Sequence, residues 1–531
     1  MIAPSTARAR RDAPVGFAPP RLVALLASVI AACAAGARPD TAAPPAPAAA
    51  AAPPRVAPGA LPSLDRWRHH VTDEVMPFWT TPDALGAPVG NFPTFRCNDG
   101  ALPRPEALCP ELAHPPRWMA GDMDKDYARM KSRQTYLYGV AFHITGDERY
   151  LEYARAGVAW LREHAYDRAS ASAITYWVRG VPGPAIDQRT AQDLAYAQVG
   201  LAFYYYLTRD PEVLADLVML ERGIMQRYWQ ASPDPPGGML RWVLADGDTP
   251  GEARREELVS QLDQINAYML LVAPLIEDAQ LASAWRRDLV LLARVVEDRF
   301  FAPEHGMFWG ALQDPESRTL GSWHTDFGHS IKAMWMLYLT GELTGERELS
   351  EFAQPLIAPL LVRAAQPSGC WGSGLSRTGE LDRGSQWWIS AELDQAAATM
   401  AGRAPSPAPY AGYLAASYAC WFTRLVDHVH HDVWPGIGPD WTPHSFDVDA
   451  PLKVHLWKNG YHVMEHALVA MITTAGLTGQ RLALYYAFAR VPPRDRIHPY
   501  YFTGSIAGEQ DHPLPQHPGL HGRRVEFEAL R

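Results

Sequence analysis

Positive charge is in the minority in this chain. Lys and Arg number 48 against 58 Asp and Glu, the formal net charge is −10, and no long basic run interrupts the sequence. Proteins that bind nucleic acids concentrate Lys and Arg on one face or along one segment. The sequence therefore predicts no nucleic-acid partner.

Cysteine is also scarce, with five in 531 residues. None has the spacing from another cysteine or from histidine that a zinc site needs, so the sequence predicts no metal centre. Cys97 and Cys109 flank a proline-rich segment. In an oxidising compartment they could close that segment as a disulfide, and two free thiols are the alternative.

Long apolar runs are missing as well. Residues 22–32 form an apolar run of about eleven residues, too short for a transmembrane helix, behind a start rich in arginine. This is typical of a signal peptide, and the sequence Ile-Ala-Ala-Cys that ends at Cys33 is similar to the lipobox of bacterial lipoproteins. Cys33 would then carry a lipid anchor, and ordinary cleavage near Ala32 or Ala35 is the alternative.

These features divide the chain into three parts. Residues 1–33 are expected to be a signal peptide with a lipobox, and residues 34–60, almost all Ala and Pro, a semi-extended tether. Residues 61–531 are expected to form one catalytic domain. The protein would be exported, either to the periplasm or to a membrane that holds it by its lipid.

Helical periodicity dominates from about residue 122 onward. Short polar turns interrupt it at residues 145–147, 208–210, 277–279, 344–346, 402–409 and 478–479. A helical hairpin cannot bury its apolar stripe alone, so six of them are expected to stack side by side. We predict an all-α fold, a single (α/α)6 barrel with the first helix of each pair inside; an open solenoid is the alternative. The longer loops between pairs should gather at one end.

Two charged clusters fall on expected inner helices. Arg133 shares a helical face with Met130 and Leu137, a costly place for a cation unless it meets a partner or a ligand. Its planar fork suits a sugar oxygen or an oxyanion, and a structural ion pair is the alternative. His329 and Lys332 share the start of another helix. The ammonium is expected to keep His329 neutral and basic, and a core histidine is the alternative.

Adjacent tryptophans mark a third cluster. Trp387 and Trp388 point in different directions from one helix, so one can pack in the core while the other offers its face to a sugar ring. Two core tryptophans are the alternative. Glu392 follows one turn after Trp388 on the same helix.

The fourth cluster lies near the end of the periodic region. Trp457 and Tyr461 precede His462, and Glu465 lies one helical turn after that histidine. A carboxylate beside a histidine raises its pKa and fixes its orientation.

Together, in this order over residues 120–490, the four clusters resemble the N-acylglucosamine 2-epimerase superfamily, which includes cellobiose 2-epimerases, mannose isomerases and sulfoquinovose isomerases. The resemblance implies an (α/α)6 barrel in which His329 and His462 face each other as proton carriers. It implies that Arg133 steadies the sugar oxygen and that Trp387 or Trp388 stacks on the ring.

Two positions differ from the pattern of that family. Lys332 stands where the family has a glutamate, and Tyr268, two residues after Asn266, stands where it has a histidine. We expect Asn266 and Tyr268 to contact the substrate. We also expect the buried ammonium of Lys332 to find a counter-charge in Glu465, because the helices of both histidines should line the cavity; a solvent-facing Lys332 is the alternative.

The predicted function is a sugar epimerase or isomerase whose partner is a small reducing carbohydrate. A base would remove the C2 proton, Arg133 would stabilise the enediolate, and the proton would return at C2 or at C1. This chemistry requires no metal and no organic cofactor. One alternative is an exported glycoside hydrolase or polysaccharide lyase, with a carboxylate pair drawn from Asp263, Glu392 and Glu465. The other is a non-catalytic sugar-binding lipoprotein.

Overall fold

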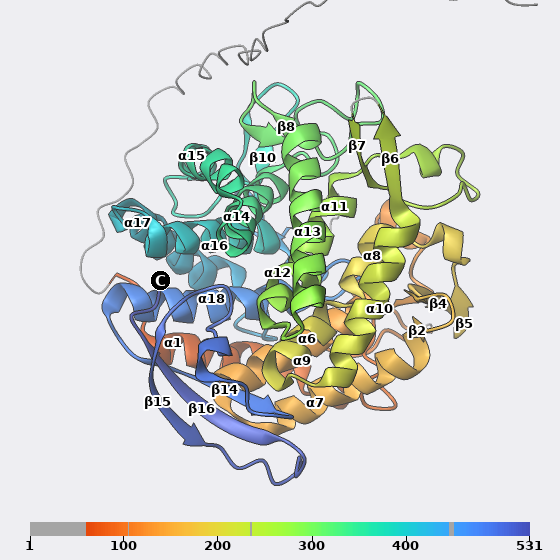
Figure 1. The fold of residues 1–531 in the computed structure, drawn as a ribbon. Helices are drawn as coiled ribbons and strands as arrows, with labels where there is room; N and C mark the ends of the chain where they lie inside the picture. The colour runs from red at the N-terminus through yellow and green to blue at the C-terminus, as the bar shows by residue number, and fades with distance from the viewer. Residues whose placement is uncertain (1–59, 105, 234–235, 445–450) are drawn as a thin grey trace, which may run out of the picture. The chain divides into compact units, whose positions relative to one another are not determined.

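Six helical segments in which nearly every residue is buried form the inner layer of the fold (Figure 1). The computed structural model describes residues 60–104, 106–233, 236–444 and 451–531. In chain order the inner segments are α6 (Ala128–Thr145), α8 (Ala191–Tyr196) with α9 (Val199–Thr208), α11 (Leu258–Gln264) with a π-helical turn (Ile265–Met269) and α12 (Leu270–Val272), α14 (Phe327–Thr344), α16 (Trp387–Arg403) and α18 (Tyr461–Thr478). Each segment packs against the next, and α18 packs back against α6. The ring is therefore closed, and the open solenoid is excluded.

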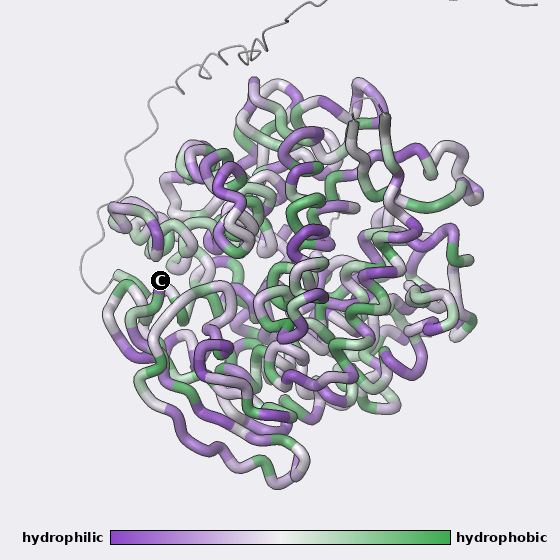
Figure 2. Tube along the Cα trace, in the orientation of Figure 1, coloured by the Kyte–Doolittle hydropathy of each residue, from purple (hydrophilic) through white to green (hydrophobic). Residues whose placement is uncertain are grey.

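Amphipathic helices surround this ring. They are α7 (Glu148–Trp160), α10 (Pro211–Tyr228), α13 (Ala279–Val295), α15 (Arg347–Ala364) and α17 (Ala408–Cys420). Figure 2 shows the alternation of hydrophilic and hydrophobic residues clearly along α13, as expected for a helix with one face on a core. The (α/α)6 barrel predicted from the sequence is confirmed.

The sixth outer position is filled from the other end of the chain. Helix α1 (Leu64–His69) and the π-helical turn His70–Val75 pack against α18. After the corner at residues 478–479 the chain enters a strand, not the outer helix that the repeat pattern suggested. The first described helix and the last inner helix thus complete one pair.

The repeated corners have a local cause. Gly146 adopts a φ of 75°, a left-handed conformation that suits glycine at a helix end, and Gly345 does the same with 83°. Asp147 then accepts a hydrogen bond from the N–H of Arg149 and so caps the outer helix. Because every inner segment ends at such a short corner, all of them begin at the opposite end, here called the N-terminal end of the barrel.

Longer connections with short strand pairs precede the inner segments. They contain β1 (Lys125–Tyr127), β2 (Tyr166–Asp167), β3 (Ser172–Ala173), β4 (Tyr176–Val178), β5 (Val181–Gly183), β6 (Trp229–Pro233), β7 (Pro236–Leu240), β8 (Phe301–Ala302), β9 (Met307–Phe308), β10 (Gly374–Leu375), β11 (Leu381–Asp382), β12 (Ser385–Gln386) and β13 (Gly436–Ile437). An antiparallel sheet of β14 (Leu482–Phe488), β16 (His521–Glu528) and β15 (Ser505–Asp511), in that order, covers α6 and α9. Figure 1 shows this sheet at the bottom of the view and β6, β7, β8 and β10 at the top.

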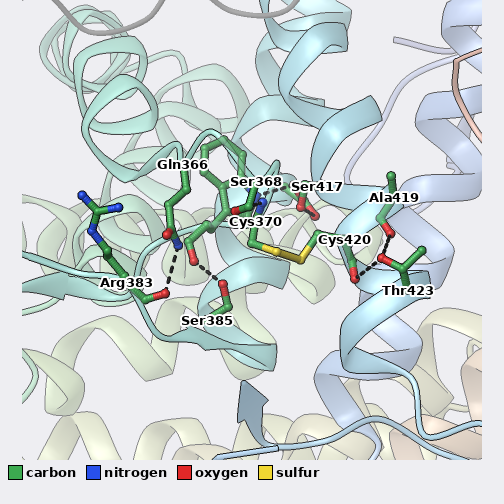
Figure 3. The surroundings of a disulfide bond; sticks show 11 residues. Gln366, Ser368, Cys370, Arg383, Ser385, Ser417, Ala419, Cys420 and Thr423 are labelled. Atoms are coloured by element: carbon green, nitrogen blue, oxygen red, sulfur yellow. Dashed lines mark hydrogen bonds between the residues drawn. A yellow bond between two sulfur atoms is a disulfide. The ribbon is translucent and has the colours of Figure 1, made fainter. Parts of the chain in front are cut away.

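Two disulfides close loops in the barrel. Cys97 is joined to Cys109, the first of the two alternatives that the sequence left open. Cys370 is joined to Cys420, which ties the connection after α15 to the last residue of α17 (Figure 3). The second pair was not foreseen. Because its members are 50 residues apart, the cross-link lowers the conformational entropy of the unfolded chain, which stabilises the fold by about 4 kcal/mol.

Cys33, the signal segment and the tether lie outside the described residues. In the part of the chain that the structure describes, no helix is both long and apolar enough to cross a lipid bilayer.

Candidate active site

The first turns of three inner helices bring His329, Trp388 and His462 together at the N-terminal end of the barrel. The ring centroids of His329 and Trp388 are 4.7 Å apart, and those of Trp388 and His462 are 6.4 Å apart. The two histidines, which are 133 residues apart in the sequence, therefore lie beside the same indole.

Gly328 allows this close approach between α14 and α16. A Cβ atom at this position would lie 2.5 Å from the ring of Trp388 and 2.7 Å from the side chain of Ile389, closer than any real contact. The Gly-His motif at the start of α14 thus has a packing reason. The missing side chain leaves room for the indole that lies beside both histidines.

Asp326 fixes the orientation of His329. One of its carboxylate oxygens caps α14 by accepting the His329 backbone N–H at 2.8 Å, and the other lies 2.7 Å from Nδ1 of the same histidine. Since Nδ1 is engaged, Nε2 is the ring nitrogen left for a ligand. Sequence reasoning missed Asp326, although an aspartate directly before a helical run is a known cap signal.

Glu465 performs the same task for His462. Its Oε2 lies 3.3 Å from Nδ1 of His462, and its Oε1 accepts a hydrogen bond from the Tyr500 hydroxyl at 2.7 Å. Burial, opposed by Glu465, lowers the pKa of His462 to about 4, so its imidazole is neutral at pH 7. Tyr500 comes from the C-terminal segment, and no sequence motif pointed to it.

Lys332 does not pair with Glu465, and that expectation was wrong. Its Nζ donates to Asp263 Oδ1 at 2.7 Å and to the Tyr196 hydroxyl at 3.2 Å, because the side chain leaves α14 toward α8 and α11. Although burial opposes it, Asp263 with Tyr196 and Glu392 raises the pKa of Lys332 above its usual value. The ammonium is thus matched by Asp263, and His329 takes its support from Asp326.

Glu392 is a buried carboxyl with one free oxygen. Oε2 accepts a hydrogen bond from Trp335 Nε1 at 2.9 Å, while Oε1 has no hydrogen-bond partner among the described residues and lies 3.9 Å from Lys332 Nζ. Burial raises the pKa of Glu392 to about 8, with Lys332 opposing and Glu465 adding to the rise. The group is therefore mostly protonated at pH 7 and can donate a hydrogen bond.

Arg133 is a buried cation without a carboxylate partner in the described ranges. Its Nη1 donates to the Trp457 carbonyl at 2.7 Å, and its guanidinium carbon lies 3.8 Å from the centre of the Tyr196 ring. Its Nε has no hydrogen-bond partner among the described residues. A desolvated guanidinium held in this way favours a ligand with a developing negative charge.

Two more of the predicted residues, Asn266 and Trp387, bring buried polar atoms close to Tyr461 and His462, whereas Trp457 does not. The Asn266 amide lies 3.5 Å from the Tyr461 hydroxyl, and its Oδ1 is buried without a partner. Trp387 has a buried Nε1 without a partner and places its ring centroid 6.5 Å from that of His462. Trp457 instead covers Arg129, with its ring 3.6 Å from the guanidinium carbon.

Tyr268 lies outside the site, so its predicted contact with the substrate was wrong. Its hydroxyl donates to Gln264 within the same helical segment at 3.1 Å, and its ring packs against Trp285 on the outer helix α13. The physical reason is helical geometry. Tyr268 comes two residues after Asn266, so the two side chains leave the helix on nearly opposite sides.

A cavity of about 550 Å³ lies at the other end of the barrel, among the last turns of the inner helices. Tyr500 and Tyr501 line it, and Tyr500 also reaches Glu465 behind His462. A layer of tyrosines therefore stands between this cavity and the histidines. Within the described residues, the group with metal-ligand geometry is Cys97, Cys109 and Glu111, whose two thiols form a disulfide.

Comparison with known proteins places the chain near sugar epimerases. No family model matches it. The cellobiose 2-epimerase of Bacteroides fragilis is 23% identical over 356 residues, which is 63% of this chain and 84% of that protein.

Solved structures agree on the fold. The cellobiose 2-epimerase of Bacillus thermoamylovorans B4167 has a TM-score of 0.61 at 15% identity, over 77% of this chain and 98% of that one. A D-mannose isomerase has a TM-score of 0.58 at 15% identity, over 78% of this chain and 99% of that one. The solved structures share the fold, and the sequence likeness to cellobiose 2-epimerases bears out the resemblance to the N-acylglucosamine 2-epimerase superfamily at low identity.

Proposed function

We propose that the protein is a sugar epimerase or aldose–ketose isomerase that moves the C2 proton of a reducing sugar. The observation that carries the proposal is the pair of histidines whose rings both lie close to that of Trp388, each with its Nδ1 beside a carboxylate. Such a pair leaves two Nε2 atoms for proton transfer at one ligand.

Four buried polar atoms around the histidines support a ligand rich in hydroxyl groups. Buried polar atoms in folded proteins are nearly always hydrogen-bonded, so a group of unpartnered ones near the histidines is available to the hydroxyl groups of a ligand. The atoms are Arg133 Nε, Asn266 Oδ1, Trp387 Nε1 and Glu392 Oε1. Donors and acceptors in this mixture match the alternating hydroxyls of a sugar.

The proposed reaction starts from the open-chain aldose. One neutral histidine removes the C2 proton, the C2 electrons form the C1–C2 double bond, and the carbonyl oxygen becomes an enediolate oxygen. Arg133 stabilises that charge, and protonated Glu392 donates a hydrogen bond to it. For epimerisation the other histidine carries a proton on Nε2 and gives it to C2 on the opposite face, and the C1 carbonyl forms again. For isomerisation the first histidine returns its proton to C1 while the O2 proton passes to O1, so that the carbonyl forms at C2.

Hydrolysis is less well supported by the same residues. A glycosidase needs one carboxylic acid and one carboxylate on opposite sides of the scissile bond. Asp263 is held by Lys332 and by Gln192, and Glu465 is held by Tyr500 and faces His462. Of the three candidates, only Glu392 has a free oxygen.

Deuterium exchange tests the proposed function. The purified barrel is mixed with reducing mono- and disaccharides in D2O, and C2 is followed by NMR. Incorporation of deuterium at C2, with appearance of the epimer or ketose, supports the proposal. Chain shortening without exchange would show a hydrolase, and thermal stabilisation without either would show a binding protein.

The proposed acid and base predict a bell-shaped pH profile. The rate of C2 exchange should fall below about pH 4, where His462 becomes protonated, and above about pH 8, where Glu392 ionises. Glu392→Gln keeps a neutral donor that cannot ionise, so the variant should lose the alkaline limb while retaining part of the rate. An unchanged alkaline limb in Glu392→Gln would assign that limb to another group.

Export and lipid anchoring remain part of the proposal. The two disulfides accord with an oxidising compartment, and the lipobox-like sequence supplies the attachment point. Cys33→Ala should move the protein from the membrane fraction to the soluble periplasmic fraction, as measured by fractionation and immunoblotting. If the variant stays with the membrane, Cys33 is not the anchor.

A further inference from the structure

The cavity at the end of the barrel opposite the histidines is large enough, at about 550 Å³, to hold a small organic molecule. Its walls come from the last turns of the inner segments and from the C-terminal segment, and they are largely apolar. The apolar side chains of the walls include those of Leu270, Leu271, Leu275, Leu339, Leu343 and Phe502. The proposed reaction uses none of these residues, so the cavity is available to a second ligand.

Two guanidinium groups make part of this wall positive. Arg403, in the last turn of α16, donates to the carbonyl oxygens of Thr399 and Tyr501 at 3.5 and 3.1 Å and forms no ion pair with a described residue. Arg531 also lines the cavity without a carboxylate partner in the described part of the chain. Among the described lining residues, Glu342 is the only carboxylate side chain, and it is exposed. The charge of the walls therefore favours an anion.

Tyr500 connects the cavity to one of the two pairs of histidine and carboxylate. It lines the cavity, and its hydroxyl donates at 2.7 Å to Glu465, whose other oxygen lies 3.3 Å from Nδ1 of His462. Its backbone has a φ of 57°, a left-handed conformation that is strained for a residue with a side chain and is concentrated at functional sites. Its N–H donates to the Tyr206 hydroxyl at 2.9 Å. The position of Tyr500 therefore affects how Glu465 holds His462.

Tyr501 makes a second connection between the cavity and the candidate active site. It also lines the cavity, and its ring centroid is 5.6 Å from that of Trp335, whose Nε1 donates to Glu392. The rings of Tyr500 and Tyr501 are 4.0 Å apart. A ligand that packs against these two tyrosines would therefore contact the supports of both Glu465 and Glu392.

We propose that this cavity is an effector site for a small organic acid with an apolar body, and that its occupant raises the activity of the barrel by holding Tyr500 and Tyr501 in place. The carboxylate of the ligand would pair with Arg403 and Arg531, and its body would pack against the leucine side chains. The effect on activity rests on the proposed function, whereas the binding of the acid does not.

Titration calorimetry with 2-naphthoate and with its neutral analogue 2-naphthamide tests the site without turnover. The wild-type protein should bind the acid about tenfold more tightly than the amide, the contribution of one charge-assisted contact. Arg403→Met should remove this preference and still bind the amide. The matched control is Arg424→Met, which should keep the preference, because Arg424 lies beside Trp441 and not at the cavity.

A second variant covers the case in which Arg403→Met does not fold. Arg531→Met changes an exposed side chain and should lower the preference for the acid about threefold, since a partly solvated charge contributes less. Equal affinity for the acid and the amide, or no saturable binding of either, would overturn the site. A preference that survives both substitutions would place the acid elsewhere on the protein and overturn it as well.

Kinetics test the connection to the candidate active site. Saturating 2-naphthoate should raise kcat/KM for C2 exchange about fivefold, a typical coupling between two sites. Tyr500→Phe keeps a ring at the cavity but removes the hydroxyl that reaches Glu465, so the variant should bind 2-naphthoate and lose the activation. Tyr410→Phe, a change on the outer helix α17, is the control and should keep both. Binding of the acid without any change in exchange by the wild-type protein would overturn the effector role.

The two measurements separate failure of the effector site from failure of the proposed function. If the protein exchanges C2 and 2-naphthoate does not bind, the proposed function stands and the effector site falls. If 2-naphthoate binds through Arg403 and no sugar exchanges C2, the proposed function falls. The effector role is then decided by calorimetry, since 2-naphthoate must still change the affinity of the protein for a sugar.

Discussion

Replacing His462 with asparagine should lower the rate of sugar epimerisation by about 10²- to 10⁴-fold, the usual contribution of a positioned acid or base. Asparagine keeps a polar side chain of similar reach but cannot carry a proton at neutral pH. The neutral imidazole, made so by burial, is the form that can accept the C2 proton. The measurement is the rate of epimer formation and, separately, the rate of deuterium uptake at C2.

The same change at His329 distinguishes the two histidines. If each serves one face of C2, either variant should lose epimerisation, yet one should still exchange the C2 proton of the substrate through the histidine that remains. The control is His69→Asn, which should leave both rates unchanged. His69 is an exposed residue at the end of the outer helix α1 and pairs with Asp73 in the turn that follows. An epimerisation rate near wild type in His329→Asn or His462→Asn would refute the two-histidine mechanism.

Local chemistry made the barrel predictable from sequence. Short polar corners, such as Thr145-Gly146-Asp147 and Thr208-Arg209-Asp210, specify a helix end followed by a helix start, and this signal repeats because each hairpin solves the same packing problem. The positions of Arg133, His329 and His462 near the starts of inner helices follow from the same repeat. Their meeting at one end of the barrel is a consequence of topology, since parallel inner helices begin together.

The partner of Lys332 could not be read in the same way. Which neighbour a buried lysine meets depends on the rotation of α14 about its axis, and the sequence pattern does not say whether the side chain points toward α8 and α11 or toward α18. Asp326 was missed for a different reason. Its side chain acts both as a helix cap and as the support of His329, and the capping signal alone does not reveal the second role.

The C-terminal residues show the limit of repeat-based reasoning. After Thr478 the helical period ends, and the segment that follows forms the β14–β16 sheet and supplies Tyr500. Tyr500 contacts Glu465 across 35 residues of chain and also accepts a hydrogen bond from Tyr136 of α6. No local pattern encodes such contacts, because they arise only when the end of the barrel is closed.

Breaking the Lys332–Asp263 pair should destabilise the protein by about 3–5 kcal/mol for either single change, the cost of leaving one buried charge without its partner. Both side chains are almost fully buried, and the distance between Nζ and Oδ1 is 2.7 Å. Lys332→Met leaves the carboxylate of Asp263 with only the uncharged donors Gln192 and Tyr196. Chemical denaturation of each variant gives the free energy of unfolding.

The double variant Lys332→Met with Asp263→Leu should recover much of this loss, because it buries no unpaired charge and fills a similar volume. Lys332→Met with Glu465→Gln is the matched comparison. If Asp263 is the partner, the first double variant is far more stable than the sum of its single losses predicts, whereas the losses in the second nearly add. Additive losses for Lys332 and Asp263, with strong coupling between Lys332 and Glu465, would instead restore the pairing expected from the sequence. Lys332→Glu, which introduces the residue typical of the related family, should be the most damaging single change, since it places a third carboxyl beside Asp263 and Glu392.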